Sequence, residues 1–164
     1  MTTTLYPPGL AGTTLMLPAF LAGWGNTSIM ARATIKTTKQ PQTTTTIAFS
    51  DADQTDMDIG FRQFISLRLT PGQTITGEQQ IRASIRVKED TSSGNMFLAM
   101  AIRVMAADGV TVQKVVLPLT RDDVEADTVA LTSRAFFATS EPGNYTTVDG
   151  DRLVIELGLG GDPV

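Results

Sequence analysis

Apolar and polar side chains alternate with a period of two along most of the chain, and the clearest run covers residues 75–88. Its apolar positions, such as Ile81 and Ile85, are separated by polar ones. Successive side chains point to opposite faces of a β-strand, whereas a helix would spread these residues around its circumference. The pattern therefore predicts one strand, or a pair of strands with a kink near Gly77, because glycine in a strand often marks an interruption.

Similar patterns predict further strands over residues 29–36, 43–49, 59–69, 96–106, 110–117, 129–139 and 152–159. Residues 96–106 are apolar at consecutive positions, which is typical of a central strand covered on both faces. The Asp108-Gly109 pair lies between two apolar runs and predicts a hairpin turn. Residues 120–127 predict the only helix, with Thr120 as its N-cap and acidic residues in its first turn.

About eight strands with at most one short helix define the expected fold class, which is all-β: an antiparallel β-sandwich of jelly-roll type. We expect a single sandwich domain over residues 29–164, preceded by an extended N-terminal arm over residues 1–28. Proline and glycine interrupt any regular element in the arm. Its apolar side chains predict that it is buried, either against the chain's own sandwich or against a partner subunit. The candidate interface residues are Leu5, Tyr6, Leu15, Leu17, Phe20, Leu21 and Trp24.

The chain contains no histidine and no cysteine. Ser-His-Asp catalysis, histidine-bound metals, thiol nucleophiles and cysteine-bound zinc are therefore excluded. No glycine-rich loop has the form that cradles a phosphate. We accordingly expect a protein without catalytic residues, metal or cofactor.

One catalytic class survives these exclusions, because two carboxylates are enough for glycoside hydrolysis. Glu78 and Glu156 both fall on predicted strands. A sugar-binding cleft is usually lined by aromatic rings, however, and this chain has one Trp and two Tyr. We therefore expect both glutamates to lie on solvated strand faces.

A cluster of acidic residues could supply oxygen ligands to calcium; its members are Asp51, Asp53, Asp56 and Asp58. It does not form an EF-hand loop, because the sixth position is Asp56 and not glycine, and the twelfth is Arg62 and not glutamate. A solvated loop between strands is the preferred interpretation.

Five basic side chains fall on two predicted strand faces: Arg62, Arg68, Arg82, Arg86 and Lys88. If the two strands are neighbours, these residues and Phe64 form a cationic docking face for an acidic protein surface or a nucleic-acid backbone. The alternative is a hydrated outer face that is kept charged to prevent aggregation at sheet edges. The net charge of −4 does not favour nucleic acid as a partner.

The most apolar stretch, residues 15–24, contains Pro18 and is too short to span a bilayer. The first four residues lack the positive charge of a secretory signal. We expect a chain that is made in the cytoplasm and has no membrane partner.

Several segments resemble tailed-bacteriophage virion proteins with a β-sandwich or jelly-roll fold, of the capsid-decoration or fibre-associated type. The resemblance rests on residues 73–77, on residues 81–89 running into residues 96–104, on Gly-Asp-Arg-Leu at residues 150–153 with the alternation up to residue 158, and on Trp24. It covers about half of the chain, mainly residues 73–117 and 150–158.

The resemblance implies a non-enzymatic structural protein of the virion, most simply a capsid decoration or cement protein. Its partners would be the major capsid protein and further copies of itself, with a homotrimer as one candidate assembly. An alternative function is a carbohydrate-binding module of a tail fibre or a secreted enzyme, which would need exposed rings or calcium at residues 51–58. A glycanase that uses Glu78 and Glu156 ranks third.

Overall fold

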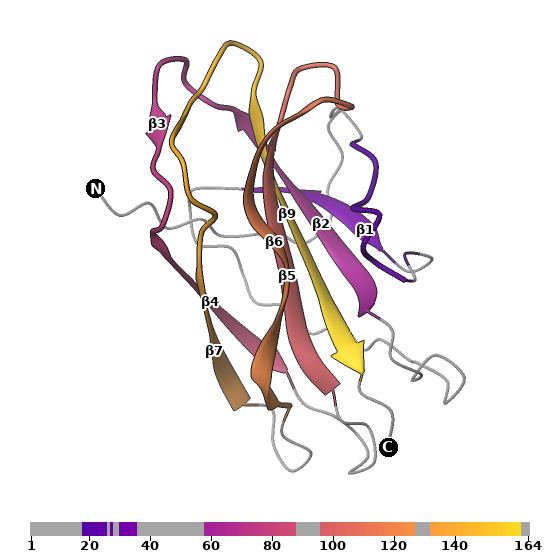
Figure 1. Cartoon of the computed structure of the whole chain (residues 1–164). Coiled ribbons are helices and arrows are strands. Elements are labelled where there is room, and N and C mark those ends of the chain that lie inside the picture. Colours follow the sequence, from indigo (N-terminus) through magenta and orange to yellow (C-terminus); the bar gives the residue numbers. More distant parts are fainter. Residues whose placement is uncertain are drawn as a thin grey trace.

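The computed structural model describes residues 18–25, 27, 30–35, 58–87, 96–126 and 132–161. Within these residues the chain is all-β and contains no helix. The strands are β1 (Ala31–Thr34), β2 (Asp58–Arg68), β3 (Thr74–Ile75), β4 (Gln80–Val87), β5 (Met96–Met105), β6 (Val112–Glu125), β7 (Thr132–Thr139), β8 (Tyr145–Thr146) and β9 (Arg152–Gly161). Five of these strands form a sheet in the order β1-β2-β9-β5-β6, and the other four form two pairs, β3-β8 and β4-β7 (Figure 1).

Strand β5 is an inner strand of the five-stranded sheet, as its two-sided apolar pattern predicts. It pairs with β9 on one side and with β6 on the other, and every β5 side chain except that of Phe97 is buried. The predicted β5–β6 hairpin is confirmed, and Gly109 in its loop has a φ of 73°. Asp108 stabilises this loop because its Oδ1 accepts hydrogen bonds from the backbone N–H groups of Val110 and Thr111, at 2.8 and 2.9 Å.

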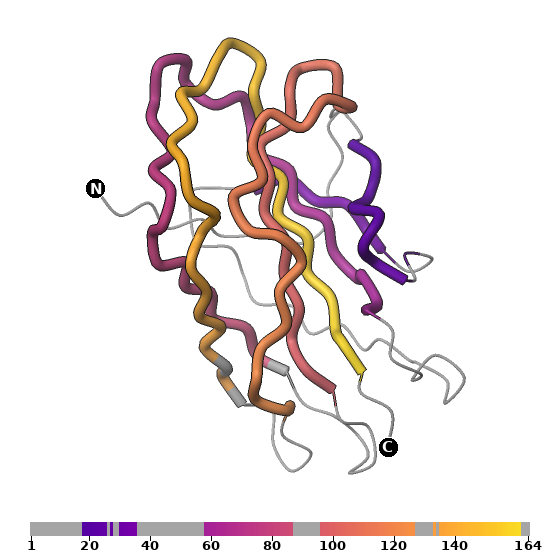
Figure 2. The backbone as a smooth tube through the Cα atoms, in the orientation of Figure 1, coloured from indigo at the N-terminus to yellow at the C-terminus, as the bar shows by residue number. Residues whose placement is uncertain are grey.

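The predicted interruption near Gly77 is also confirmed. Strands β3 and β4 are separated by residues 76–79, and Glu78 has a φ of 56°. A Cβ atom on Gly77 would lie 2.6 Å from the backbone nitrogen of Gly143, so this close approach of two chain segments requires glycine. The two strand pairs therefore follow one another as a ribbon made of residues 74–87 and 132–146. Figure 2 shows that the loop after β2 and the loop before β9 meet at the same end of the molecule, where the N–H of Gly72 donates to the carbonyl of Thr147 at 2.8 Å.

The largest hydrophobic core lies between the five-stranded sheet and the ribbon. Phe136 of β7 is 1% exposed and packs in one cluster with apolar side chains of β5, β6 and β9. The ribbon also contributes Ile81, Ala83 and Ile85 of β4. The predicted one-sided alternation of the last strand is confirmed, because Leu153, Ile155, Leu157 and Leu159 all belong to this core or pack against it.

The predicted helix over residues 120–127 is wrong. Strand β6 continues to Glu125 because this segment pairs with β5, with Thr120 opposite Met100 and Arg121 opposite Ala99. The hydroxyl of Thr120 donates to the carbonyl of Pro118 at 2.9 Å and does not cap a helix. Long-range strand pairing therefore overrides the local N-cap signal.

The expectation of purely antiparallel strands is wrong at one edge of the sheet. Strand β1 pairs with β2 in parallel, with Ala31 opposite Arg62 and Thr34 opposite Ile65. Residues 35–57 connect the two strands, and a parallel pair needs a connection of about a dozen residues or more. The predicted strand over residues 43–49 lies outside the described residues.

The alternation predicted over residues 59–69 also fails in part of β2. Residues 63–66 are all buried, and Leu67, an apolar residue of this strand, is 67% exposed. The pairing of β2 with β9 shifts between Ile65 and Arg68. An irregularity of this kind moves later side chains to the other face, so a strict period of two fails here.

Candidate functional site: the buried Glu156 cluster and the β6–β7 groove

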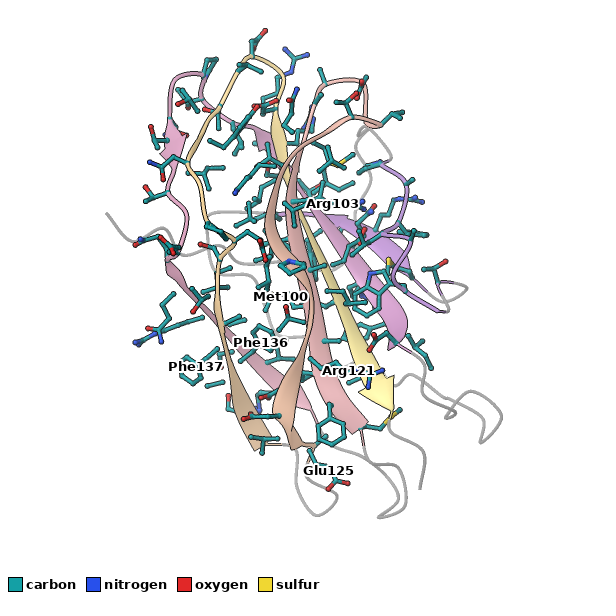
Figure 3. All side chains as sticks on the ribbon, viewed as in Figure 1. Met100, Arg103, Arg121, Glu125, Phe136 and Phe137 are labelled. Atoms are coloured by element: carbon teal, nitrogen blue, oxygen red, sulfur yellow. The ribbon has the colours of Figure 1, made fainter. Side chains whose placement is uncertain are left out.

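A cluster of buried polar side chains lies on the face of the five-stranded sheet opposite the main core. Its centre is Glu156 of β9, which is 1% exposed, between Gln63 of β2 and Arg103 of β5. Register places Arg32 beside Gln63 and Gln63 beside Glu156, so three neighbouring strands supply one row of polar groups. Figure 3 shows Arg103 within the body of the molecule.

The carboxylate of Glu156 has partners at both oxygens. Oε1 lies 2.5 Å from Nη2 of Arg103 and accepts a hydrogen bond from Nε2 of Gln63 at 2.8 Å. Oε2 accepts from the indole Nε1 of Trp24 at 2.8 Å and from the backbone N–H of Leu21 at 3.0 Å. A charge this deeply buried is stable only when it is paired and hydrogen-bonded, and this carboxylate meets both conditions.

The same cluster holds the backbone of residues 18–24, which we call the strap. Nη2 of Arg103 donates to the carbonyl of Ala19 at 2.6 Å, and Nη2 of Arg32 donates to the carbonyl of Pro18 at 3.1 Å. The guanidinium of Arg32 also lies 4.2 Å from the centre of the Phe20 ring, which is a favourable cation–π distance. Charged groups of the sheet therefore satisfy backbone groups of an irregular segment that has no strand partner of its own.

At the end of the strap, the Trp24 side chain packs on two glycines of the sheet. Its indole lies over Gly158 of β9, where a Cβ atom would overlap the indole ring and would lie 2.3 Å from the carbonyl oxygen of Ile59. At Gly60 of β2, a Cβ atom would overlap Met30 and would lie 3.2 Å from the indole. The two glycines make the space that a tryptophan ring needs on a sheet face.

The structure thus places three of the seven candidate arm residues, and all three lie on the chain's own sheet. Trp24 is 5% exposed, and Phe20 and Leu21 are half-buried beside it. The division of the chain at residue 28 stays a prediction, but residues 18–24 pack as part of the sheet domain. The other four candidates, Leu5, Tyr6, Leu15 and Leu17, lie outside the described residues.

The two glutamates of the glycanase hypothesis lie in different environments. Glu156 is buried in the strap cluster, contrary to the expected solvated position. Glu78 is exposed at the interruption of the ribbon. Glu156 therefore acts as a structural anchor for the strap.

The basic residues do not form one continuous stripe on adjacent strands. Arg62 and Arg68 belong to β2, whose neighbours are β1 and β9, whereas Arg82 and Arg86 belong to β4, whose neighbour is β7. Phe64, expected on this face, is only 7% exposed. Lys88 lies outside the described residues.

The acidic cluster is described only at Asp58, whose Oδ1 lies 2.7 Å from Nε of Arg121. Asp51, Asp53 and Asp56 lie outside the described residues. In the part of the chain that the structure describes, no three acidic side chains gather around a common metal position.

A second candidate site is an open groove between β6 and β7, which we call the β6–β7 groove. Its lining residues are Arg121, Asp122, Asp123, Val124, Ala135 and Phe137. Phe137 is 56% exposed and Val124 is 55% exposed, so large apolar side chains meet solvent here. Figure 3 shows Phe137 pointing away from the body of the molecule, in contrast to its neighbour Phe136.

Sequence reasoning missed the two side chains that complete the Glu156 cluster. Arg103 is the single polar residue of an otherwise apolar strand, Gln63 lies between Arg62 and Phe64 in a mixed strand, and Gly60 and Gly158 are glycines inside strands. Buried polar residues need partners, and strand glycines often mark close approach of another group. Such residues could have indicated a buried row of polar side chains on one face of the sheet. They could not have indicated that the strap covers this row.

Comparison with protein families, with curated proteins and with solved structures finds no match to this chain. The described residues include no helix that is long and apolar enough to cross a membrane.

Proposed function

We propose that this chain is a non-enzymatic structural protein of a tailed-bacteriophage virion, acting as a decoration or cement subunit that self-associates and stabilises the head shell. We further propose that its strands form a jelly-roll-like β-sandwich. The five-stranded sheet and the β4–β7 ribbon contribute opposite sides of one hydrophobic core, which supports two packed layers.

The observation that carries the proposal is the fixed position of the strap. Pro18 is buried, and its carbonyl accepts hydrogen bonds from Arg32 and Gln63. The apolar residues Leu15 and Leu17 directly precede it in the sequence. Any contact that residues 1–17 make with a neighbouring subunit therefore starts from a defined point on the sheet. An extended chain spans about 3.3–3.6 Å per residue, so this segment is long enough to reach an adjacent subunit.

A cement protein gains strength from many small contacts repeated over a symmetric shell. Each subunit must then transmit load from its contact segment to its own fold. The ion pair between Arg103 and Glu156 supports such a role, because it ties the strap to the central strand β9 and its inner neighbour β5.

The proposal is tested on virus particles purified from the source of this sequence. We expect the chain in the head, in a fixed ratio to the major capsid protein, when the particles are quantified by mass spectrometry. Its absence from the particle would contradict the proposal. Saturable binding to a glycan array, together with that absence, would favour the carbohydrate-binding alternative.

The role of residues 1–17 is tested by rebinding purified chain to particles from which it has been removed. We expect the double variant Leu15→Asp/Leu17→Asp to bind at least about tenfold more weakly than the native chain, since two apolar anchors are lost. The matched control is Thr13→Asp/Thr14→Asp, which adds the same charge in the same segment and should bind almost normally. Equal binding by both double variants would show that the apolar side chains make no contact with the shell.

A further inference from the structure

The outer face of the ribbon and the β6–β7 groove form one continuous surface across three strands. Strands β4 and β7 are paired, with Arg82 opposite Phe137 and Ser84 opposite Ala135. Strand β6 lies on the other side of β7, because Asp122, Asp123 and Val124 line the same groove as Ala135 and Phe137. We call this surface the β6–β7–β4 face.

The centre of this face is apolar and exposed. Phe137 and Val124 each leave more than half of their surface in contact with solvent. Phe136, the next residue back along β7, is 1% exposed in the core, so the alternation of β7 itself directs Phe137 outward. A large aromatic side chain at the middle of a surface patch is the typical anchor of a protein–protein contact.

The charges on the two sides of Phe137 have opposite signs. On the β6 side the groove is lined by Asp122 and Asp123, and also by Arg121, whose Nε lies 2.7 Å from Oδ1 of Asp58 and whose charge is thus met within the chain. On the β4 side, the guanidinium of Arg82 lies 5.5 Å from the centre of the Phe137 ring. Arg86, four residues further along β4, is exposed on the same face of the strand. The face therefore carries an acidic half and a basic half with an apolar residue between them.

We infer that the β6–β7–β4 face binds a second copy of the same face, about a two-fold axis that passes close to Phe137. In such an isologous contact the acidic half of each copy meets the basic half of the other, and the two Phe137 rings meet near the axis. A charge pattern of this kind is complementary to itself. A partner of one sign, such as a nucleic-acid backbone, would be attracted by Arg82 but repelled by Asp122 and Asp123.

This inference rests on the self-association in the proposed function, and it names the surface and the symmetry of one contact between subunits. The inference and the proposed function can fail separately. Particle composition tests the role in the virion, whereas the mass of the purified chain in solution tests this contact.

The test is sedimentation velocity of the full chain and its variants over a range of concentrations, with circular dichroism to verify that each variant is folded. We expect a reversible dimer for the native chain. Phe137→Asp should weaken dimerisation by about a hundredfold, as loss of a central anchor does. The control is Val148→Asp, which introduces the same charge at another exposed apolar position, 51% exposed, and should dimerise normally.

A charge-swap experiment tests the symmetry of the contact. Arg82→Glu and Asp123→Arg should each weaken dimerisation by at least about tenfold, because each places like charges opposite one another twice. An equimolar mixture of the two variants should dimerise almost as well as the native chain, since every pair in the mixed dimer again joins opposite charges. A native chain that stays monomeric at all concentrations would overturn the inference. So would equal dimerisation of the Phe137 and Val148 variants, or a mixture that remains as weak as its components.

Discussion

The guanidinium Nη2 of Arg103 lies 2.5 Å from the carboxylate Oε1 of Glu156, and the same nitrogen donates to the carbonyl of Ala19. One side chain of β5 thus joins its neighbour β9, the central strand of the sheet, to the backbone of the strap. The side chains of Arg103 and Glu156 are 8% and 1% exposed, so solvent screens this pair weakly. We therefore expect the packing of the strap on this face of the sheet to depend on the pair between Arg103 and Glu156.

Removing one member of the ion pair should destabilise the protein strongly. We expect Arg103→Met to lower the free energy of unfolding by about 3–5 kcal/mol, because it leaves the carboxylate of Glu156 buried without its counter-charge. The double variant Arg103→Met/Glu156→Gln should lose less than the sum of the two single variants. Urea denaturation of all four proteins measures this coupling, and strict additivity would contradict a direct pair.

The close contact beneath Trp24 predicts sensitivity to one added methyl group. Gly158→Ala should lower the free energy of unfolding by about 1–3 kcal/mol, since the new Cβ atom meets both the indole and the Ile59 carbonyl. Gly23→Ala is the control, because the nearest atom to its Cβ is the flexible end of Leu119, at 3.3 Å. Similar denaturation midpoints for both variants would show that the indole does not lie on Gly158.

Two truncations separate the strap from the segment before it. Deletion of residues 1–17 should lower the free energy of unfolding less than deletion of residues 1–24, because the hydrogen bonds from Leu21 and Trp24 to Glu156 and from Arg103 to Ala19 remain. Deletion of residues 1–24 should destabilise the fold by about 3 kcal/mol or more, since it uncovers Gly158 and removes two donors from Glu156. Thermal unfolding followed by circular dichroism distinguishes them. Equal stability of the two truncated chains would mean that the strap does not hold the sheet.

Tyr145 gives a prediction at alkaline pH. Partial burial and a 2.6 Å hydrogen bond to Asp151 raise its pKa from 10 to about 12. Between about pH 10 and pH 12 the unfolded chain loses this proton while the folded chain keeps it, so stability falls as the pH rises through this window and is unaffected by this group below it. The chain has two tyrosines, so absorbance titration of a Tyr6→Phe variant follows Tyr145 alone. A midpoint near pH 10 in the folded protein would contradict the contact with Asp151.

Strands were predictable where the two faces differ in polarity. Residues 81–86 alternate between half-buried and exposed positions because the core covers a single side of β4. Residues 152–159 kept their alternation although both sides of β9 are covered, because Glu156 and Gly158 on the strap side break the apolar run of the core side. The prediction failed at residues 120–125, where pairing with β5 outweighs a helix signal that is purely local. It also failed at Leu67, because an irregular register cannot be read from side-chain polarity.

The candidate site was less predictable than the fold. Glu156 was noticed as a carboxylate on a strand, but its role depends on Trp24, which is far away in the sequence, and on Gln63 and Arg103 from two other strands. A sequence pattern gives the face of a residue but not which distant segment covers that face. The exposed position of Phe137 was equally hidden, since Phe136 beside it is just as apolar and only one of the two can point inward.

The most direct test of the covered sheet face is acrylamide quenching of Trp24, the only tryptophan in the chain. We predict that the folded full-length protein resists quenching and that Arg103→Met increases quenching under native conditions, because the strap then loses one of its anchors. A tryptophan that is quenched as readily in the folded protein as in urea, while circular dichroism still shows β structure, would contradict the account.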